Sequence, residues 1–165
     1  MRESETNSGE TVLVLDSNVA ELERLEAFIS AFCDKEGVPE EISYQLQVAL
    51  EELVLNAIKY GNCEPAEDAI RLAIKKEGDE VSAVLSDSGA GFNPLDMPPP
   101  DLTKSVLERP VGGLGIHLVR HLIPSIRYER REGRNHLYLT KPVKSAGTLS
   151  QEEETHANGD GNNQN

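Results

Sequence analysis

The sequence lacks the features of disulfide-rich, zinc-binding and membrane-spanning proteins. Its 165 residues include no tryptophan and only two cysteines, Cys33 and Cys63. One such pair makes neither a disulfide framework nor the repeated spacing of a zinc site. No apolar run approaches the ~20 residues of a membrane-spanning helix, and no basic segment followed by an apolar run begins the chain. These absences predict a cytoplasmic protein without a membrane contact.

Basic residues are also scarce. The chain has 16 Lys and Arg against 29 Asp and Glu, for a net charge of −13. Residues 11–103 carry 19 acidic and six basic side chains, whereas residues 104–144 carry three acidic and nine basic ones. Duplex DNA and anionic lipid are poor partners for so acidic a chain, because both carry dense negative charge. The composition therefore predicts no direct nucleic-acid contact, and it fits either plain solubility or a protein partner.

Two polar stretches flank a segment with enough apolar residues to fold. Apolar residues make up 38% of the chain, but residues 1–9 and 144–165 contain few of them. Such stretches bury too little apolar surface to offset the entropy lost on ordering, so we expect both to be disordered. The sequence therefore predicts one domain of ordinary size over residues 10–143.

The spacing of apolar residues predicts an α+β domain. Alternating residues predict strands, and apolar residues three and four apart predict helices. The expected strands are 11–15, 69–75, 81–85, 126–132 and 136–140, with a turn at 133–135 between the last two. The expected helices cover about 22–37, 39–61 and 115–123, and Gly61 and Asn62 are expected to end the second in a left-handed cap. This order predicts an antiparallel or mixed sheet with helices on one face.

Three polar side chains share one face of the helix expected over residues 39–61. Glu52 and Asn56 are four residues apart and Lys59 follows three residues later, so a carboxylate, an amide oxygen and an ammonium lie together. They could be the ordinary solvated face of an amphipathic helix, because such faces are common. The alternative is a polar site beside the stripe that packs on the sheet.

A second pattern places an aspartate at the end of an apolar strand. Asp87 ends the strand, and Gly89 and Gly91 follow it. A strand end can aim a carboxylate into a pocket, and glycines allow a ligand to approach the backbone closely. An ordinary strand-ending turn has the same composition, so this pattern alone leaves both interpretations open.

The third pattern is a glycine-rich turn before the last expected helix. Gly112, Gly113 and Gly115 place backbone N–H groups at a helix N-terminus, which is a ready cradle for phosphate. Their spacing does not match a P-loop. They also follow a proline-rich segment and not a parallel strand, so the Rossmann context is missing.

The order and spacing of the three patterns resemble the GHKL, or Bergerat-fold, ATPase superfamily. Within it, the chain is most similar to the anti-sigma-factor serine/threonine kinases of the RsbW type. The resemblance covers about residues 11–141. It implies a two-layer α+β sandwich that binds ATP and Mg²⁺, with residues 93–111 as a lid over the nucleotide.

The resemblance also implies a role for each residue of the patterns. Asn56 would bind Mg²⁺ through its amide oxygen, and Glu52 would act as the general base. Asp87 would accept a hydrogen bond from the adenine amino group. The other residues would contact the nucleotide: Lys59 near the phosphates, Gly89 and Gly91 in the loop that holds it, and Gly112, Gly113 and Gly115 in the turn around the phosphates.

The function implied by the resemblance is phosphorylation of a serine or threonine of a small anti-anti-sigma-like (STAS-type) protein. A sigma factor would be a second partner, and the assembly would be a homodimer. A module that binds ATP and a partner without phosphotransfer is one alternative. Members of the family carry a basic residue on the first helix, and this residue has no unique counterpart here. Arg24 is the nearest basic residue, whereas an alignment without gaps places Glu26 at that position. A detached histidine-kinase domain is another, because residues 56–60 fit it, although no phosphoacceptor histidine helix precedes them.

Overall fold

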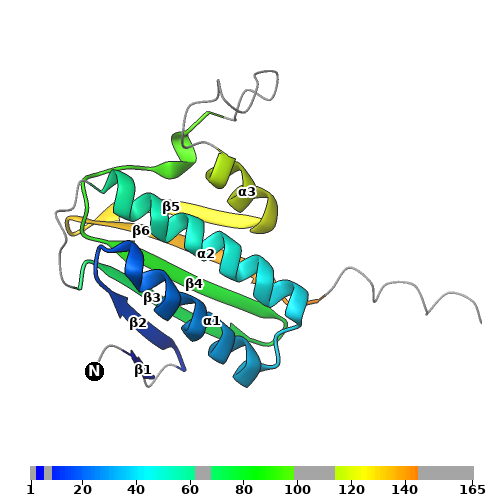
Figure 1. Cartoon of the computed structure of the whole chain (residues 1–165). Helices are drawn as coiled ribbons and strands as arrows, with labels where there is room; N and C mark the ends of the chain where they lie inside the picture. The colour runs from blue at the N-terminus through cyan, green and yellow to red at the C-terminus, as the bar shows by residue number, and fades with distance from the viewer. Residues whose placement is uncertain (1–2, 6–8, 62–67, 99–113, 145–165) are drawn as a thin grey trace, which may run out of the picture.

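The computed structural model describes residues 3–5, 9–61, 68–98 and 114–144, which form one sheet with helices on one face (Figure 1). The strands follow the order β1-β2-β3-β4-β6-β5, and each neighbouring pair is antiparallel. They are β1 (Glu3–Glu5), β2 (Thr11–Leu15), β3 (Ile70–Glu77), β4 (Glu80–Asp87), β5 (Ser125–Arg131) and β6 (Arg134–Pro142). The expected α+β two-layer fold is confirmed, and the sheet is antiparallel.

Three α-helices cover the sheet (Figure 1). They are α1 (Leu22–Glu36), α2 (Glu40–Tyr60) and α3 (Leu114–Leu122), and two 3₁₀ turns, η1 (Val19–Glu21) and η2 (Pro94–Asp96), accompany them. The side chain of Asn18 accepts the N–H of Ala20 and so begins η1. Gly37 ends α1 with φ +62°, the left-handed conformation that glycine adopts without strain.

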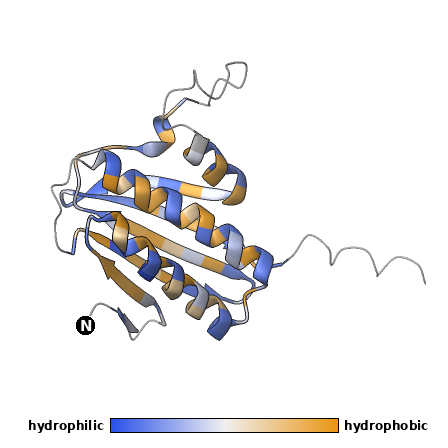
Figure 2. Cartoon of the chain, viewed as in Figure 1, coloured by the Kyte–Doolittle hydropathy of each residue, from blue (hydrophilic) through white to orange (hydrophobic). Residues whose placement is uncertain are grey.

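The core fills the space between the sheet and the helices. Side chains alternate along a strand, so Leu13 and Leu15 of β2 both point toward the helices and are fully buried. On α2, Leu46, Leu50 and Leu53 recur at helical spacing and are buried against them. Figure 2 shows these apolar residues along the strands beneath the helices.

Three local features differ from the sequence expectations. Glu3–Glu5, within the segment expected to be disordered, forms a strand because it pairs with the otherwise open edge of β2. Gly61 caps α2 with φ −64°, a right-handed conformation, so this glycine is not needed for a left-handed cap; Asn62 lies outside the described residues. Asn135 belongs to β6 and not to the turn, because it pairs with Arg130 across the β5–β6 hairpin.

The sheet register brings one end of four elements together. Asp87, the last residue of β4, pairs with Ile70 at the start of β3 and with Asn135 near the start of β6. The N–H of Ala90 then donates to the carbonyl of Gly61 at the end of α2, over 2.9 Å. The loop after β4 is therefore fixed between the sheet and α2, at the left end of the molecule in Figure 1.

Candidate functional site

The polar side chains on one face of α2 become more exposed toward the C-terminal end of the helix. Glu52 and Asn56 are half-buried, whereas Lys59, one turn further on, is exposed. The three residues lie on one face, as four- and three-residue spacing on a helix requires. The carboxylate and the amide are therefore partly covered by neighbouring elements, whereas the ammonium lies at the exposed end of the helix.

A small cavity of about 20 Å³ lies between the end of α2 and the strand ends. It has an apolar body with a few polar groups, and its walls are Leu53, Asn56, Ala57, Gly61, Asp87, Phe92, Pro94, Tyr128, Asn135 and Leu137. Its volume is enough for about one water molecule, so a nucleotide base enters only if one wall moves.

Asp87 is the buried carboxylate of this cavity, with 8% of its surface exposed. Its Oδ1 accepts the N–H of Gly89 over 2.9 Å and the side-chain amide of Asn135 over 2.8 Å. Among the described residues, no hydrogen bond ends on Oδ2. Within this part of the chain, both printed hydrogen bonds of the carboxylate therefore go to one oxygen, Oδ1.

Asn135 is the site residue that the sequence did not reveal. It is 4% exposed and lines the same cavity. The available signal was its position: it has the same strand parity as the core residues Leu137 and Leu139, so it faces inward. A buried polar side chain at such a position requires partners.

Gly89 and Gly91 are required for different reasons. A Cβ at Gly89 would lie 2.6 Å from the Cα of Gly61, which is backbone and cannot move aside. A Cβ at Gly91 would lie 3.1 Å from the flexible side chain of Arg130, which can. The close approach of two chain segments, and not a positive φ, therefore explains Gly89.

We expect Gly89→Ala to lower stability by about 1–3 kcal/mol, because the added methyl group separates α2 from the loop after β4. Gly91→Ala is the matched control, since only the Arg130 side chain must shift. Thermal unfolding of both variants measures the difference. Equal melting temperatures for Gly89→Ala and the wild-type protein would show that the loop is not packed on Gly61.

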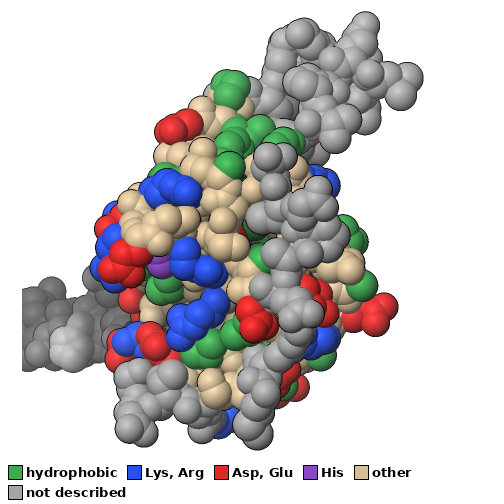
Figure 3. Space-filling model, turned by 90° about the vertical axis from the view of Figure 1, so that its left-hand side faces the viewer, with side chains coloured by type: hydrophobic (Ala, Val, Ile, Leu, Met, Phe, Trp, Pro, Cys, Tyr) green, Lys and Arg blue, Asp and Glu red, His purple; other side chains and the backbone are tan. Residues whose placement is uncertain are grey.

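Two arginines hold the loops at this end of the sheet. Arg130 Nη1 donates to the carbonyl of Gly89, and Arg134 Nη2 donates to the carbonyl of Ala69, each over 3.1 Å. Figure 3 looks onto this end and shows basic side chains among acidic ones. The hairpin between β5 and β6 therefore contributes directly to the shape of the site.

The N-terminus of α3 lies against the carboxylate of Glu52. A Cβ at Gly115 would overlap the carboxylate oxygen of Glu52, so a larger residue there would displace that carboxylate. Gly112 and Gly113, expected in the same turn, lie outside the described residues. At the other end of α3, burial lowers the pKa of Lys141, whose ammonium donates to the carbonyl of Leu122 over 2.6 Å.

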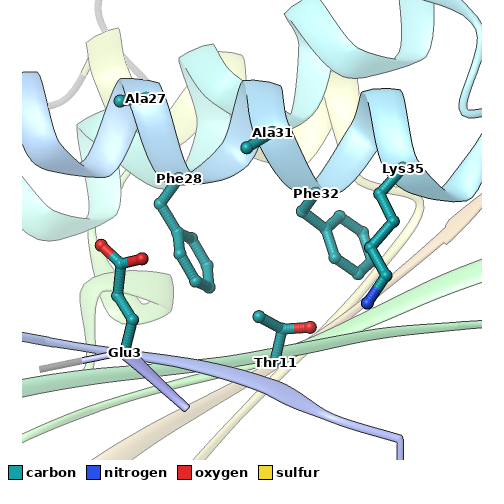
Figure 4. Close-up of a pocket in the computed structure, with 7 residues that line it drawn as sticks. All are labelled: Glu3, Thr11, Ala27, Phe28, Ala31, Phe32 and Lys35. Carbon is teal, nitrogen blue, oxygen red and sulfur yellow. The ribbon is translucent and has the colours of Figure 1, made fainter. Parts of the chain in front are cut away.

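A larger cavity of about 230 Å³ lies elsewhere, between α1 and the strands β1 and β2 (Figure 4). Its floor and walls are mostly apolar, with Phe28 and Phe32 pointing toward the sheet. Glu3 and Lys35 are its charged residues. None of the residues expected to bind ATP lines it, so size alone does not identify the site.

The donor atoms around α2 and β4 fit a magnesium nucleotide. Asn56 offers an amide oxygen and Glu52 a carboxylate, and hard oxygen ligands are those that Mg²⁺ prefers. Asp87 offers an acceptor in a mostly apolar cavity, as an amino-substituted base requires. An added Cβ at Gly89 would overlap the backbone of Gly61, so the site admits no bulkier residue there.

The described residues contain neither a cluster of metal ligands nor a membrane-spanning helix. No three His, Cys, Asp or Glu side chains gather in them as a metal-binding cluster. No helix in this part of the chain has the length and apolar character to cross a membrane.

Comparison with known proteins places these features in a family. The family model of the histidine kinase-like ATPase domain matches residues 15–141. The serine/threonine-protein kinase BtrW of Bordetella bronchiseptica is 31% identical over 99 residues, which cover 60% of this chain and 70% of BtrW.

A solved structure has the same fold. It contains the RsbU and RsbW domains of Rv1364c from Mycobacterium tuberculosis and aligns with a TM-score of 0.61 at 18% identity. The alignment covers 81% of this chain but only 32% of that protein's length. At this identity the likeness shows the fold alone.

Proposed function

Because this chain belongs to the histidine kinase-like ATPase family, we propose that it is an ATP-dependent serine/threonine kinase whose site is formed by α2, the loop after β4 and the start of α3. The observation that carries the proposal is the placement of Glu52. Its carboxylate lies one helical turn before Asn56 and against Gly115 at the N-terminus of α3. A base, a metal ligand and a helix N-terminus thus meet at one point.

In this proposal each residue has one task. Asp87 accepts a hydrogen bond from the adenine amino group, which fixes the base between α2 and the sheet. Asn56 holds Mg²⁺, which when bound would neutralise charge on the phosphate oxygens. Lys59 and the glycines Gly112, Gly113 and Gly115 would contact the phosphates, and Gly89 and Gly91 would shape the loop beside the base.

Glu52 accepts the proton of the partner's hydroxyl group. The hydroxyl oxygen forms a bond to the γ-phosphorus as the bond from that phosphorus to the β–γ bridging oxygen breaks, so ADP leaves and the proton remains on Glu52. Positioning and charge stabilisation supply most of the rate in such a reaction. A positioned general base adds about 10²–10⁴-fold.

The proposed substrate is a small anti-anti-sigma-like protein of the STAS type. The support is the named serine/threonine kinase that this chain resembles and the resemblance of its motifs to anti-sigma-factor kinases. A sigma factor is proposed as the competing partner, and a homodimer as the assembly. Release of one partner on phosphorylation of the other would make the chain a switch.

The experiment that tests this function starts from the tagged full-length chain. Proteins that co-purify with it from its host are incubated with it and γ-labelled ATP in Mg²⁺. We expect label on a serine or threonine of one small partner. Labelled histidine in place of serine or threonine would contradict the proposed chemistry, and partners that bind without accepting label would contradict the kinase assignment.

Asn56→Ala is expected to remove the effect of Mg²⁺ on ATP affinity, because the amide oxygen is the protein's ligand to the ion. Without it, Mg²⁺ should tighten ATP binding about tenfold less than in the wild-type protein. Glu51→Ala, on a different face of α2, tests whether any loss on this helix has the same effect. Titration of ATP with and without Mg²⁺ gives the result, and an unchanged Mg²⁺ effect in Asn56→Ala would exclude Asn56 as the ligand.

One observation favours a module that binds ATP and a partner without phosphotransfer. Arg24, the nearest candidate for the kinases' basic residue on the first helix, is engaged elsewhere: it pairs with Glu21 and donates to the carbonyl of Val14. The labelling experiment above separates this second function from the first.

A further inference from the structure

The side chain of Asn135 is fully engaged behind Asp87. Its Nδ2 donates to Asp87 Oδ1 over 2.8 Å and to the carbonyl of Ala90 over 2.9 Å. Its Oδ1 accepts from the hydroxyl of Tyr128 over 2.8 Å and from Nη1 of Arg130 over 2.7 Å. An amide has two donor and two acceptor positions, so every one of them is used.

These partners fix which way the amide faces. The guanidinium of Arg130 can only donate, so it requires the oxygen of Asn135. The carbonyl of Ala90 can only accept, so it requires the nitrogen. A flipped amide would lose both bonds in a buried site, where unpaired polar groups are costly. Asn135 therefore always presents a donor to residue 87.

That donor determines which atom of residue 87 faces the cavity. Asn135 and the N–H of Gly89 both donate to Asp87 Oδ1, so an acceptor atom is required at that position. The other terminal atom of the side chain is then the one turned to a ligand. In the wild-type protein that atom is Oδ2, an acceptor, which in the proposed function would pair with the 6-amino group of adenine.

We propose that Asn135 is the positioning residue that orients the side chain at position 87 and so makes the site select 6-amino over 6-oxo purine nucleotides. The inference rests on the proposed binding of ATP. ITP is the matched probe, because hypoxanthine carries an oxygen in place of the 6-amino group and lacks the 2-amino group of guanine.

The inference makes an unusual prediction for Asp87→Asn. The same two donors would hold the amide oxygen inward and turn its NH₂ group toward the base. That donor opposes the amino group of adenine and matches the oxygen of hypoxanthine. The ratio of the Kd for ITP to the Kd for ATP should therefore fall at least about tenfold.

Asn135→Asp in the Asp87→Asn background should raise the ratio of the Kd for ITP to the Kd for ATP again, so that the preference for ATP returns. The introduced carboxylate would keep acceptors for Tyr128 and Arg130 but replace the donor that faces position 87, and the carbonyl of Ala90 would lose its donor as well. The charged acceptor attracts the NH₂ group of the amide more strongly than Gly89 attracts its oxygen. The amide then turns its oxygen to the base, while the net charge of the pair stays that of the wild-type protein.

The test is calorimetric titration of ATP and ITP into the wild-type protein, Asp87→Asn and the double variant. Asn18→Asp in the Asp87→Asn background is the control, since it adds the same charge at the N-cap of η1 and should not change the ratio. A double variant with the same ratio as Asp87→Asn would overturn the inference. Failure of the wild-type protein to bind ATP would instead refute the proposed function.

If the double variant does not fold, Asn135→Ala alone decides the question. Loss of the positioning amide should weaken ATP binding about tenfold and ITP binding much less. Equal weakening of both nucleotides would mean that Asn135 only supports the structure, and it would overturn the inference.

Discussion

Replacing Glu52 by glutamine is expected to slow phosphate transfer to the partner by about 10²–10⁴-fold and to leave ATP affinity nearly unchanged. The amide has almost the same size as the carboxylate, so the contact with Gly115 at the start of α3 is kept. It cannot accept the hydroxyl proton at neutral pH. Single-turnover phosphorylation with saturating ATP measures the rate, and calorimetry measures the affinity.

Glu51→Gln is the control on the neighbouring residue. Consecutive residues on a helix point about 100° apart, and Glu51 already accepts a hydrogen bond from Gln47, one turn earlier, over 3.1 Å. We expect this change to be nearly silent in both assays. An unchanged phosphorylation rate in Glu52→Gln, together with loss of phosphorylation in Glu51→Gln, would show that Glu51 is the general base.

Asp87→Asn is expected to raise the Kd for ATP by roughly tenfold to a hundredfold. A mispaired polar contact in a buried site costs about 1–3 kcal/mol, and each 1.4 kcal/mol is a factor of ten in affinity. The fold should persist, because the amide oxygen can still accept from Gly89 and Asn135. Calorimetric titration measures the change.

Ser88→Ala is the matched control for Asp87→Asn. Ser88 follows Asp87, is exposed and uses its backbone N–H to bond the carbonyl of Ala69. ATP should bind this variant as it binds the wild-type protein. Equal ATP affinity in Asp87→Asn and Ser88→Ala would remove Asp87 from the site.

The parts of the site that depend on local sequence were predictable. Asp87 and Gly89 stand out because a carboxylate and glycines follow an apolar strand, and Glu52 and Asn56 because four-residue spacing places them on one helix face. A sheet with a helical layer on one face followed from apolar periodicity in the same way, although the periodicity left an antiparallel and a mixed sheet equally open. Each of these inferences needs only the residues within one element.

The parts that depend on register were not predictable. Asn135 meets Asp87 only because β4 pairs with β6, 48 residues later. The role of Gly61 arises from its contact with Gly89, across the β3–β4 hairpin. No local pattern encodes contacts between residues so far apart in the chain. Local patterns alone therefore predicted that Asn135 lies in a turn and that Gly61 forms a left-handed cap.

The most direct test of the central claim, that α2 and the loop after β4 form a Mg–ATP site, is calorimetric titration of ATP into the wild-type chain with and without Mg²⁺. We predict one nucleotide bound per chain, tighter binding when Mg²⁺ is present, and a large loss of affinity in Asp87→Asn. Absence of ATP binding to the wild-type chain, or equal affinity in Asp87→Asn, would contradict the account.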